Sequence, residues 1–532
     1  MDHAEYHGRG DHRTAAAATP LVPTVPPHIK QIEMAIMTRP LPRRHLLTTA
    51  AALGALGSSL TRPASAAQAP AAASQPARLV VGRRSIEVNG KPASVYGIRR
   101  PDGAPGLILA PGQRFNLNLE NHADEPTIIH WHGQTPPVGE DGVVETGFAS
   151  LIQPGGAQSY DFAPRFGTHW MHSHHGLQEQ LLMAAPLIIR TEADRRADLQ
   201  ETVVLLHDFT FRTPSEVLAA VAGPNATMHG SMTMPKAQSG GMGSQHMNMG
   251  GAASPMHAGS TMDLNDFDYD AYLANDRTLD DPLVVRTERS GRVRLRLING
   301  ATTTAFWVDL GALQASLVAV DGDPIKPVSG RLFPISQAQR LDIIVQLPRE
   351  GGAFPVMAQR EGDRQRTGII LASPDAAIKK ITGIADHAAP AVDIALERQL
   401  VSLSPLAARQ PDVTHRIVLA GTMQPYAWSI DGRSWADHLP LRVSKGQRVV
   451  LEMVNKSMMA HPMHLHGHHF QVIAIDGQPM NGAMRDTVLV PVHGTVTVAF
   501  DADNPGRWLL HCHNLLHMAT GMMTEVVYDN VT

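Results

Sequence analysis

The chain has 532 residues, 43% of them hydrophobic, so it is long enough to form several domains with large cores. Its formal net charge of −4 argues against a protein that binds nucleic acid. A single cysteine excludes an internal disulfide, whereas 28 histidines and 24 methionines make the sequence rich in side chains that bind metals.

The N-terminal segment 1–66 is predicted to be an extension that ends in a twin-arginine export signal. Arg43 and Arg44 precede an apolar run over 46–60, and small residues at 64–66 fit a cleavage site. The run is too short to span a membrane as a helix, so we expect no membrane anchor. An alanine-rich tail without an export role is the alternative interpretation.

Twin-arginine export carries folded proteins, so the signal predicts a periplasmic protein whose mature chain begins near Ala67. Residues 1–33 lie far upstream of the arginine pair. They are interpreted as an in-frame extension, with Met34 or Met37 as the true start.

One pattern typical of a β-strand occurs three times in the rest of the chain. The segments 112–121, 291–299 and 446–455 each begin with glycine, end with asparagine and alternate apolar with polar residues between. A period of two indicates a half-buried strand. Because helical periodicity is scarce and glycine and proline are frequent, we predict an all-β protein of three consecutive Greek-key β-sandwich domains. The predicted domains are 78–195, 196–385 and 386–532.

The segment 226–262 of the second predicted domain is rich in methionine. It has eight methionines and three histidines among glycine, serine and alanine, without an apolar period, so we predict a loop. Thioethers favour Cu(I), and the loop is therefore a candidate collector of cuprous ions. A linker with incidental methionines is the alternative. The eight methionines are Met228, Met232, Met234, Met242, Met247, Met249, Met256 and Met262.

Histidines recur as His-x-His pairs at equivalent points of the first and third copies of the repeat. Residues i and i+2 of a strand point to the same face, so each pair presents two imidazoles to one side. If the two copies face each other, eight imidazoles converge, which suits three metal ions held by two, three and three nitrogens. The four pairs are His130/His132, His172/His174, His464/His466 and His511/His513. The middle copy has lost them, with VDLG at 308–311 in place of HWHG.

The only cysteine lies between two of these histidines, in HCHNLLHMATGM at 511–522. Strand alternation turns Cys512 to the opposite face from His511 and His513, toward a second metal site. Together with His461, His517 and Met522 it offers two imidazoles, a thiolate and a weak thioether ligand, the ligand set of a blue-copper site that transfers electrons. Zinc is the competing metal for such ligands, but zinc cannot change its redox state.

With the motifs HWHG, HSH, HPMHLHG and HCHNLLHMATGM, the sequence resembles the multicopper oxidases of the three-domain laccase type, especially the bacterial copper-efflux and copper-resistance oxidases. The resemblance covers nearly all of the chain after residue 78. It implies cupredoxin-like domains and four copper ions per chain: one type 1, one type 2 and a type 3 pair. The implied ligands are His461, Cys512, His517 and Met522 for type 1, His130 and His464 for type 2, and His132, His172, His513 and His174, His466, His511 for the two type 3 ions.

The resemblance also implies a mechanism in which a reductant is oxidised at the type 1 copper, Cys512 passes electrons inward, and dioxygen is reduced to water. Asp141 matches a family acid near the cluster, so we predict it to be a catalytic proton donor or a partner of a type 2 ligand. A solvated aspartate in a turn is the alternative. Met518 stands where some family members have an acid. Met522 as axial ligand implies a modest potential, which disfavours demanding phenols.

The favoured reductant is Cu(I), in periplasmic copper tolerance, because it suits the methionine-rich segment and the export signal. A laccase-like oxidase of phenols or aryl amines is the alternative. A copper-binding protein without turnover is the alternative of another class. Copper nitrite reductase fits less well, because it needs fewer histidines and has no HCH strand. We expect a monomer.

Overall fold

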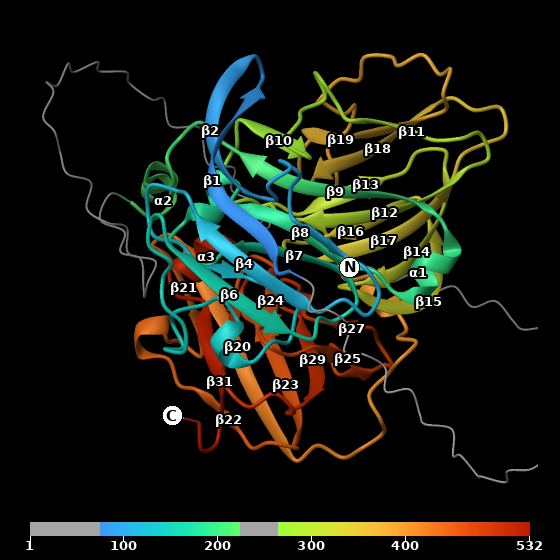
Figure 1. Ribbon diagram of the computed structural model, residues 1–532. Coiled ribbons are helices and arrows are strands. Elements are labelled where there is room, and N and C mark those ends of the chain that lie inside the picture. The colour runs from blue at the N-terminus through green and yellow to red at the C-terminus, as the bar shows by residue number, and fades with distance from the viewer. Residues whose placement is uncertain (1–74, 224–263, 532) are drawn as a thin grey trace, which may run out of the picture. The chain divides into compact units, whose positions relative to one another are not determined.

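The computed structural model describes residues 75–223 and 264–531, and within them most of the regular structure is β-strand (Figure 1). The prediction of an all-β fold is confirmed. The predicted export signal at 1–66 and the methionine-rich segment at 226–262 lie outside the described residues. None of the helices that the structure describes has the length and apolar character needed to cross a membrane.

The strands of residues 77–189 form two four-stranded sheets. They are β1 Ala77–Val88, β2 Lys91–Arg99, β3 Leu107–Leu109, β4 Phe115–Asn121, β5 Ile129–His130, β6 Ala157–Phe162, β7 Gly167–Ser173 and β8 Ala184–Ile189. One sheet has the order β2-β1-β4-β6 and the other β3-β8-β7-β5. Phe115 of the first sheet and Trp131, which follows β5, pack edge to face with ring centroids 4.8 Å apart, so one core joins both sheets.

The strands of residues 200–372 form a six-stranded and a five-stranded sheet. They are β9 Gln200–Phe209, β10 Ala271–Ala274, β11 Val284–Arg286, β12 Arg292–Asn299, β13 Phe306–Asp309, β14 Gln314–Val320, β15 Asp323–Gly330, β16 Leu332–Ile335, β17 Arg340–Gln346, β18 Ala353–Arg360 and β19 Arg366–Ala372. The orders are β10-β9-β12-β17-β14-β15 and β11-β19-β18-β13-β16. Tyr272 and Phe306 join the two sheets through an edge-to-face contact.

The strands of residues 413–528 form the last two sheets. They are β20 Val413–Met423, β21 Tyr426–Ile430, β22 Leu441–Val443, β23 Arg448–Asn455, β24 His461–Leu465, β25 Phe470–Ile475, β26 Gln478–Pro479, β27 Met484–Arg485, β28 Thr487–Val490, β29 Thr495–Asp501, β30 Arg507–Cys512 and β31 Met523–Tyr528. One sheet has the order β21-β20-β23-β29-β25-β26, with β27 paired to β25, and the other has the order β22-β31-β30-β24-β28.

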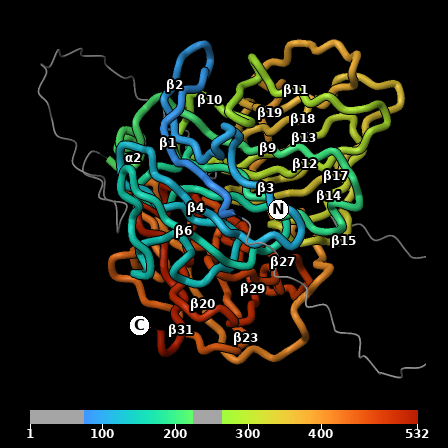
Figure 2. The backbone as a smooth tube through the Cα atoms, in the orientation of Figure 1, coloured from blue at the N-terminus to red at the C-terminus, as the bar shows by residue number. Residues whose placement is uncertain are grey.

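The three repeated segments form strands that occupy the same place in their sheets. β4, β12 and β23 each pair with one parallel neighbour, β1, β9 and β20, and with one antiparallel neighbour, β6, β17 and β29 (Figure 2). The asparagine that ends each strand is fully buried, and its amide donates to carbonyl groups of the following loop. The repeat in the sequence is therefore a repeat in the fold.

Helices are short and lie at connections. They are α1 Glu192–Ala197, α2 Pro214–Ala222 and α3 Leu515–Ala519, with 3-10 turns at η1 Val138–Glu140, η2 Gln178–Leu181, η4 Glu397–Gln399 and η5 Trp435–Asp437. α3 follows β30 and begins at Asn514, whose side chain accepts hydrogen bonds from the backbone of Leu516 and His517. This cap fixes the turn that directs His517 back toward Cys512.

Candidate metal centres

The structure brings the eight histidines of the four His-x-His pairs together from the first and last parts of the chain. β5 and β7 pair with His130 opposite His172, and β24 and β30 pair with His464 opposite His511. All eight side chains are buried. The ring centroids of His132 and His464 lie 3.8 Å apart, so histidines from the two ends of the chain stack directly on one another.

Six of the eight rings have at least one buried nitrogen without a hydrogen-bond partner. These atoms are Nε2 of His130, His172, His174, His464 and His513, Nδ1 of His132, and also Nδ1 of His174, which lies 3.7 Å from a Glu145 carboxylate oxygen. In the remaining two rings, the Nε2 atoms of His466 and His511 face each other at 3.0 Å. Buried polar atoms without partners are rare and costly. Their convergence fits metal ions, and imidazole nitrogen is a preferred ligand of copper.

Burial makes most of these histidines neutral, as metal ligands must be. Loss of solvation, assisted by the neighbouring imidazoles, lowers the pKa of six of them well below the usual value: His132, His172, His464, His466, His511 and His513. His174 differs, because burial lowers its pKa but the nearby Glu145 carboxylate outweighs this and raises it overall. The six rings with a lowered pKa therefore keep a free lone pair at neutral pH.

Asp141 lies against two of the histidines and is fully buried. Its Oδ2 atom accepts a hydrogen bond from His466 Nδ1 at 2.9 Å, and its carbonyl oxygen accepts one from His130 Nδ1 at 2.8 Å. A solvated aspartate in a turn is therefore excluded. Because each of the two Nδ1 atoms carries the proton of its ring, each Nε2 is left for a metal ion.

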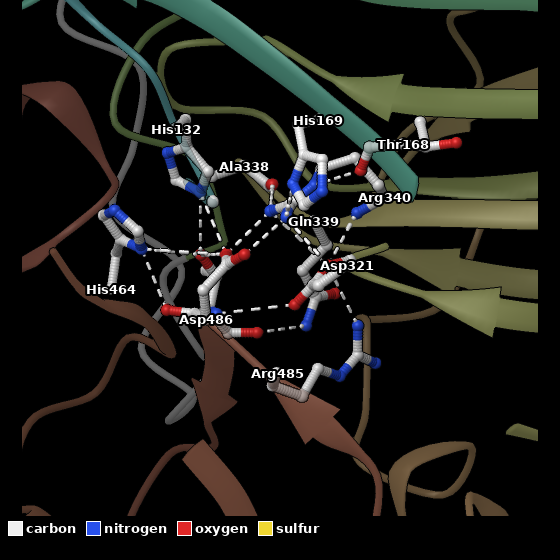
Figure 3. A network of polar contacts seen from close by, with 12 residues as sticks. His132, Thr168, His169, Asp321, Ala338, Gln339, Arg340, His464, Arg485 and Asp486 are labelled. Carbon is white, nitrogen blue, oxygen red and sulfur yellow. Dashed lines mark hydrogen bonds and ion pairs between the residues drawn. The ribbon is translucent and has the colours of Figure 1, made fainter. Parts of the chain in front are cut away.

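Other carboxylates contact the histidines in the same way but were not predicted. Asp486 lies 3.1 Å from His132 Nε2 (Figure 3), and Glu179 lies 2.9 Å from His172 Nδ1. Burial raises the pKa of Glu179 to about 8. The sequence offered a signal for Glu179, because it stands in GLQEQ directly after the HSHH motif. The short helix η2 that contains Glu179 follows β7 and brings the carboxylate back against His172 of that strand. Asp486 had no comparable signal.

The second site lies on the other side of β30. Cys512 Sγ is 3.6 Å from His517 Nδ1 and 3.7 Å from His461 Nδ1, and these two nitrogens are 3.2 Å apart. Met522 is fully buried, and its carbonyl oxygen accepts a hydrogen bond from the Cys512 amide. Burial raises the pKa of the Cys512 thiol, so a metal cation is needed to hold it as a thiolate.

Polar and aromatic groups fix both imidazoles of the second site. Ser457 Oγ lies 2.7 Å from His461 Nε2, and Asp266 Oδ1 lies 3.1 Å from His517 Nε2. Trp428 stacks on His517 with ring centroids 3.8 Å apart. Burial would raise the pKa of Asp266, but His517 and its hydrogen-bonding neighbours lower it overall, so the carboxylate stays ionised. Because their Nε2 atoms have these partners, His461 and His517 both turn Nδ1 toward the Cys512 thiol.

Comparison with known families agrees with this arrangement. Three family models, each described as multicopper oxidase, match residues 81–194, 200–376 and 408–531. The chain belongs to the multicopper oxidase family. Its activity is accordingly that of an oxidoreductase that uses copper, with dioxygen and a reductant as substrates.

This multicopper oxidase has relatives in bacteria and fungi. It is 31% identical to the multicopper oxidase MmcO of Mycobacterium tuberculosis, over 85% of this chain and 86% of that protein. It is 27% identical to copper resistance protein A of Escherichia coli, over 90% and 97%. The solved structure of a laccase from Botrytis aclada superposes with a TM-score of 0.67 at 22% identity, covering 85% of this chain and 87% of that one. The predicted cupredoxin-like fold is confirmed.

Proposed function

We propose that this multicopper oxidase binds four copper ions through the residues that converge at the two sites. The proposed ligands are His461, Cys512, His517 and Met522 at the type 1 site, His130 and His464 at the type 2 site, and His132, His172, His513 and His174, His466, His511 at the type 3 pair. The buried nitrogens without hydrogen-bond partners support the cluster assignment. The short separations of one sulfur and two nitrogens support the type 1 assignment.

Bound copper supplies one-electron redox chemistry at the thiolate site and the reduction of dioxygen to water at the cluster. The polypeptide connects the two sites through Cys512, which is joined by peptide bonds to His511 and His513. Asp141 Oδ1 is buried without a hydrogen-bond partner, 3.4 Å from His130 Nδ1. That oxygen is placed to hold a proton beside the cluster while Oδ2 keeps His466 in position.

Cu(I) is the proposed reductant, and a thioether and an imidazole that lie together at the surface support this proposal. Met458 is 40% exposed, and its Sδ lies 3.2 Å from Nε2 of the exposed His493. A thioether and an imidazole suit Cu(I). Met458 adjoins Ser457, whose hydroxyl contacts the type 1 ligand His461. An electron from a Cu(I) ion held by this pair would reach His461 through a few covalent bonds and the one hydrogen bond between Ser457 and His461.

The described residues on both sides of the methionine-rich segment contact the type 1 region, which supports a role for that segment in Cu(I) delivery. Val217 and Leu218 of α2, on its N-terminal side, belong to the same buried cluster as Trp428 and Met522. Asp266, on its C-terminal side, contacts His517.

Burial of the type 1 imidazoles favours a metal ion over a phenol as reductant. His461 and His517 are both fully buried. Asp266 and Trp428 cover His517, so this ring presents no open edge to a bulky aromatic substrate. Oxidation of phenols or aryl amines remains the alternative activity.

The reductant is tested by removing the surface ligands and comparing two substrates. Replacing Met458 with Leu and His493 with Gln, or deleting residues 228–262, is expected to slow Cu(I) oxidation while oxidation of an organic dye holds or rises. His122→Gln is the matched control, because His122 is an exposed histidine beside Glu120 in the first part of the chain. An equal loss of both activities would contradict the proposed Cu(I) site.

We further propose that the protein works in the periplasm after twin-arginine export. The order of Arg43, Arg44, the apolar run and the small-residue site supports this location. Replacing both arginines with lysine should retain the precursor in the cytoplasm, which cell fractionation measures. Unchanged export of the double variant would contradict the proposed route.

A further inference from the structure

A buried ion pair from the middle part of the chain lies directly behind the cluster histidines. Arg340, the first residue of β17, is fully buried and donates from Nη1 to Asp486 Oδ1 at 2.7 Å, while Nη2 bonds Asp486 Oδ2. Figure 3 shows Asp486 between this arginine on one side and His132 and His464 on the other. The middle sheets contribute no histidine to the cluster, yet they reach it through Arg340.

Asp486 contacts one histidine from each end of the chain. Its Oδ1 lies 3.1 Å from His132 Nε2, and its carbonyl oxygen accepts a hydrogen bond from His464 Nδ1 at 2.8 Å. These contacts place the ring proton of His132 on Nε2 and that of His464 on Nδ1. The opposite nitrogens, His132 Nδ1 and His464 Nε2, are the buried atoms without hydrogen-bond partners. One aspartate therefore selects the metal-binding nitrogen of two rings.

Every N–H of the Arg340 guanidinium has an acceptor. Besides the two carboxylate oxygens, the acceptors are the carbonyl oxygens of Thr168, Ala338 and Asp321. A guanidinium has five N–H groups in a fixed plane, whereas a lysine ammonium has three. Lysine at position 340 would therefore keep the charge but leave at least two acceptors unpaired.

The glycine of the HWHG motif is explained by the same pair. Gly133 has φ +85°, and a Cβ added there would lie 2.5 Å from Arg340 Nη2 and 2.8 Å from Asp486 Oδ2. Only glycine leaves room for the ion pair directly beside His132. The HWHG motif thus supplies two imidazoles and also, through its glycine, the room that the Arg340 side chain occupies.

We propose that Arg340 is a positioning residue of the trinuclear site: it holds Asp486, which fixes the orientation and the protonated nitrogen of His132 and His464. This inference rests on the proposed copper ligands. It assigns to the middle domain, which has lost its own ligands, the task of keeping ligands from the two other domains in register. Loss of an outer hydrogen-bond partner typically weakens metal binding by ~10–100-fold.

The test compares Arg340→Lys with Arg296→Lys in the copper-loaded full chain. Arg296 of β12 is an equally buried arginine that bonds Asp342 and Glu201 but contacts neither Asp486 nor a cluster histidine. Copper per chain is measured during competition with a chelator, together with the type 2 signal in electron paramagnetic resonance and the blue type 1 absorption. Arg340→Lys is expected to keep the blue absorption and lose cluster copper ~10–100-fold more readily than wild type. Arg296→Lys should match wild type.

Two outcomes would overturn the role of Arg340: unchanged cluster copper in Arg340→Lys, or equal loss in Arg296→Lys, which would indicate general loosening. If Arg340→Lys does not fold, Gly133→Ala provides a second test, because the added Cβ would displace the ion pair between Arg340 and Asp486. The same selective loss of cluster copper is expected. Retained cluster copper in Gly133→Ala would contradict the proposal. Wild-type protein without a type 2 signal would instead overturn the proposed copper ligands themselves, so the two failures are distinguishable.

Discussion

The carboxylate of Asp141 accepts a hydrogen bond from Nδ1 of His466, 325 residues further along the chain. Its other oxygen has no hydrogen-bond partner. Asp141→Asn keeps an acceptor for His466 but cannot hold a proton, so we expect the reduction of dioxygen to slow by ~10–100-fold. Stopped-flow measurements should show normal bleaching of the blue absorption by reductant without oxygen and slow recovery when oxygen is added. Asp161→Asn, at an exposed residue paired with Arg114, is the control; normal recovery in Asp141→Asn would contradict the role.

Cys512→Ser separates the type 1 site from the cluster. Serine lacks the soft thiolate ligand, so the variant should be colourless and should lose one of the four proposed copper ions per chain. Oxygen uptake on addition of a reductant should disappear, while the type 2 signal remains. Persistent oxygen uptake would contradict electron transfer through Cys512. A wild type without oxygen uptake would instead favour a copper-binding protein that does not turn over.

Asp266 adds a negative charge beside His517, a proposed type 1 ligand, and this charge would favour oxidised over reduced copper. Asp266→Asn should therefore raise the reduction potential, by on the order of 1–2 kcal/mol in a partly screened site, or ~50–100 mV for one electron. A redox titration of the blue absorption measures the shift. Tyr426→Phe removes a hydrogen bond to Asp266 but leaves its charge, so its shift should be smaller. A lowered potential in Asp266→Asn would refute this electrostatic account.

The raised pKa of Glu361 predicts how the free energy of unfolding changes with pH. Burial raises the pKa of Glu361 to about 7, above its unfolded value, so the folded state binds the extra proton between these two values. Stability should accordingly fall as pH rises from 5 to 7 and then level off. Glu361→Gln removes this cost and should stabilise the protein at pH 8 by ~1–2 kcal/mol. Thermal unfolding at pH 5.5 and pH 8 measures the difference; a variant less stable than wild type at pH 8 would contradict the prediction.

Much of the fold was predictable because it repeats. The alternating segments that end in Asn121, Asn299 and Asn455 became equivalent strands, since period-two patterning is a local property of the sequence. The His-x-His pairs were found in the same way, because strand geometry alone puts both rings on one face. Cys512 faces away from His511 and His513 for the same reason.

The groups that support these ligands could not be predicted, because they come from distant segments. Asp486 is 354 residues from His132, and Asp266 is 251 residues from His517. Their contacts depend on how separate sheets pack, which no local pattern specifies. Arg340 is a further case, since its strand resembles any other strand of the middle sheets.

The alternation of side chains along β30 has a consequence for how this enzyme can change. The path between the two proposed copper sites is set by the geometry of a pleated strand, which barely varies, whereas the surface around Met458 and His493 is made of loops. Insertions or exchanges in those loops can alter which reductant docks without disturbing the distance that electrons travel afterwards. A single-residue insertion within the strand would have the opposite effect, because it would turn the thiol toward the oxygen-reducing side and silence the enzyme for every substrate.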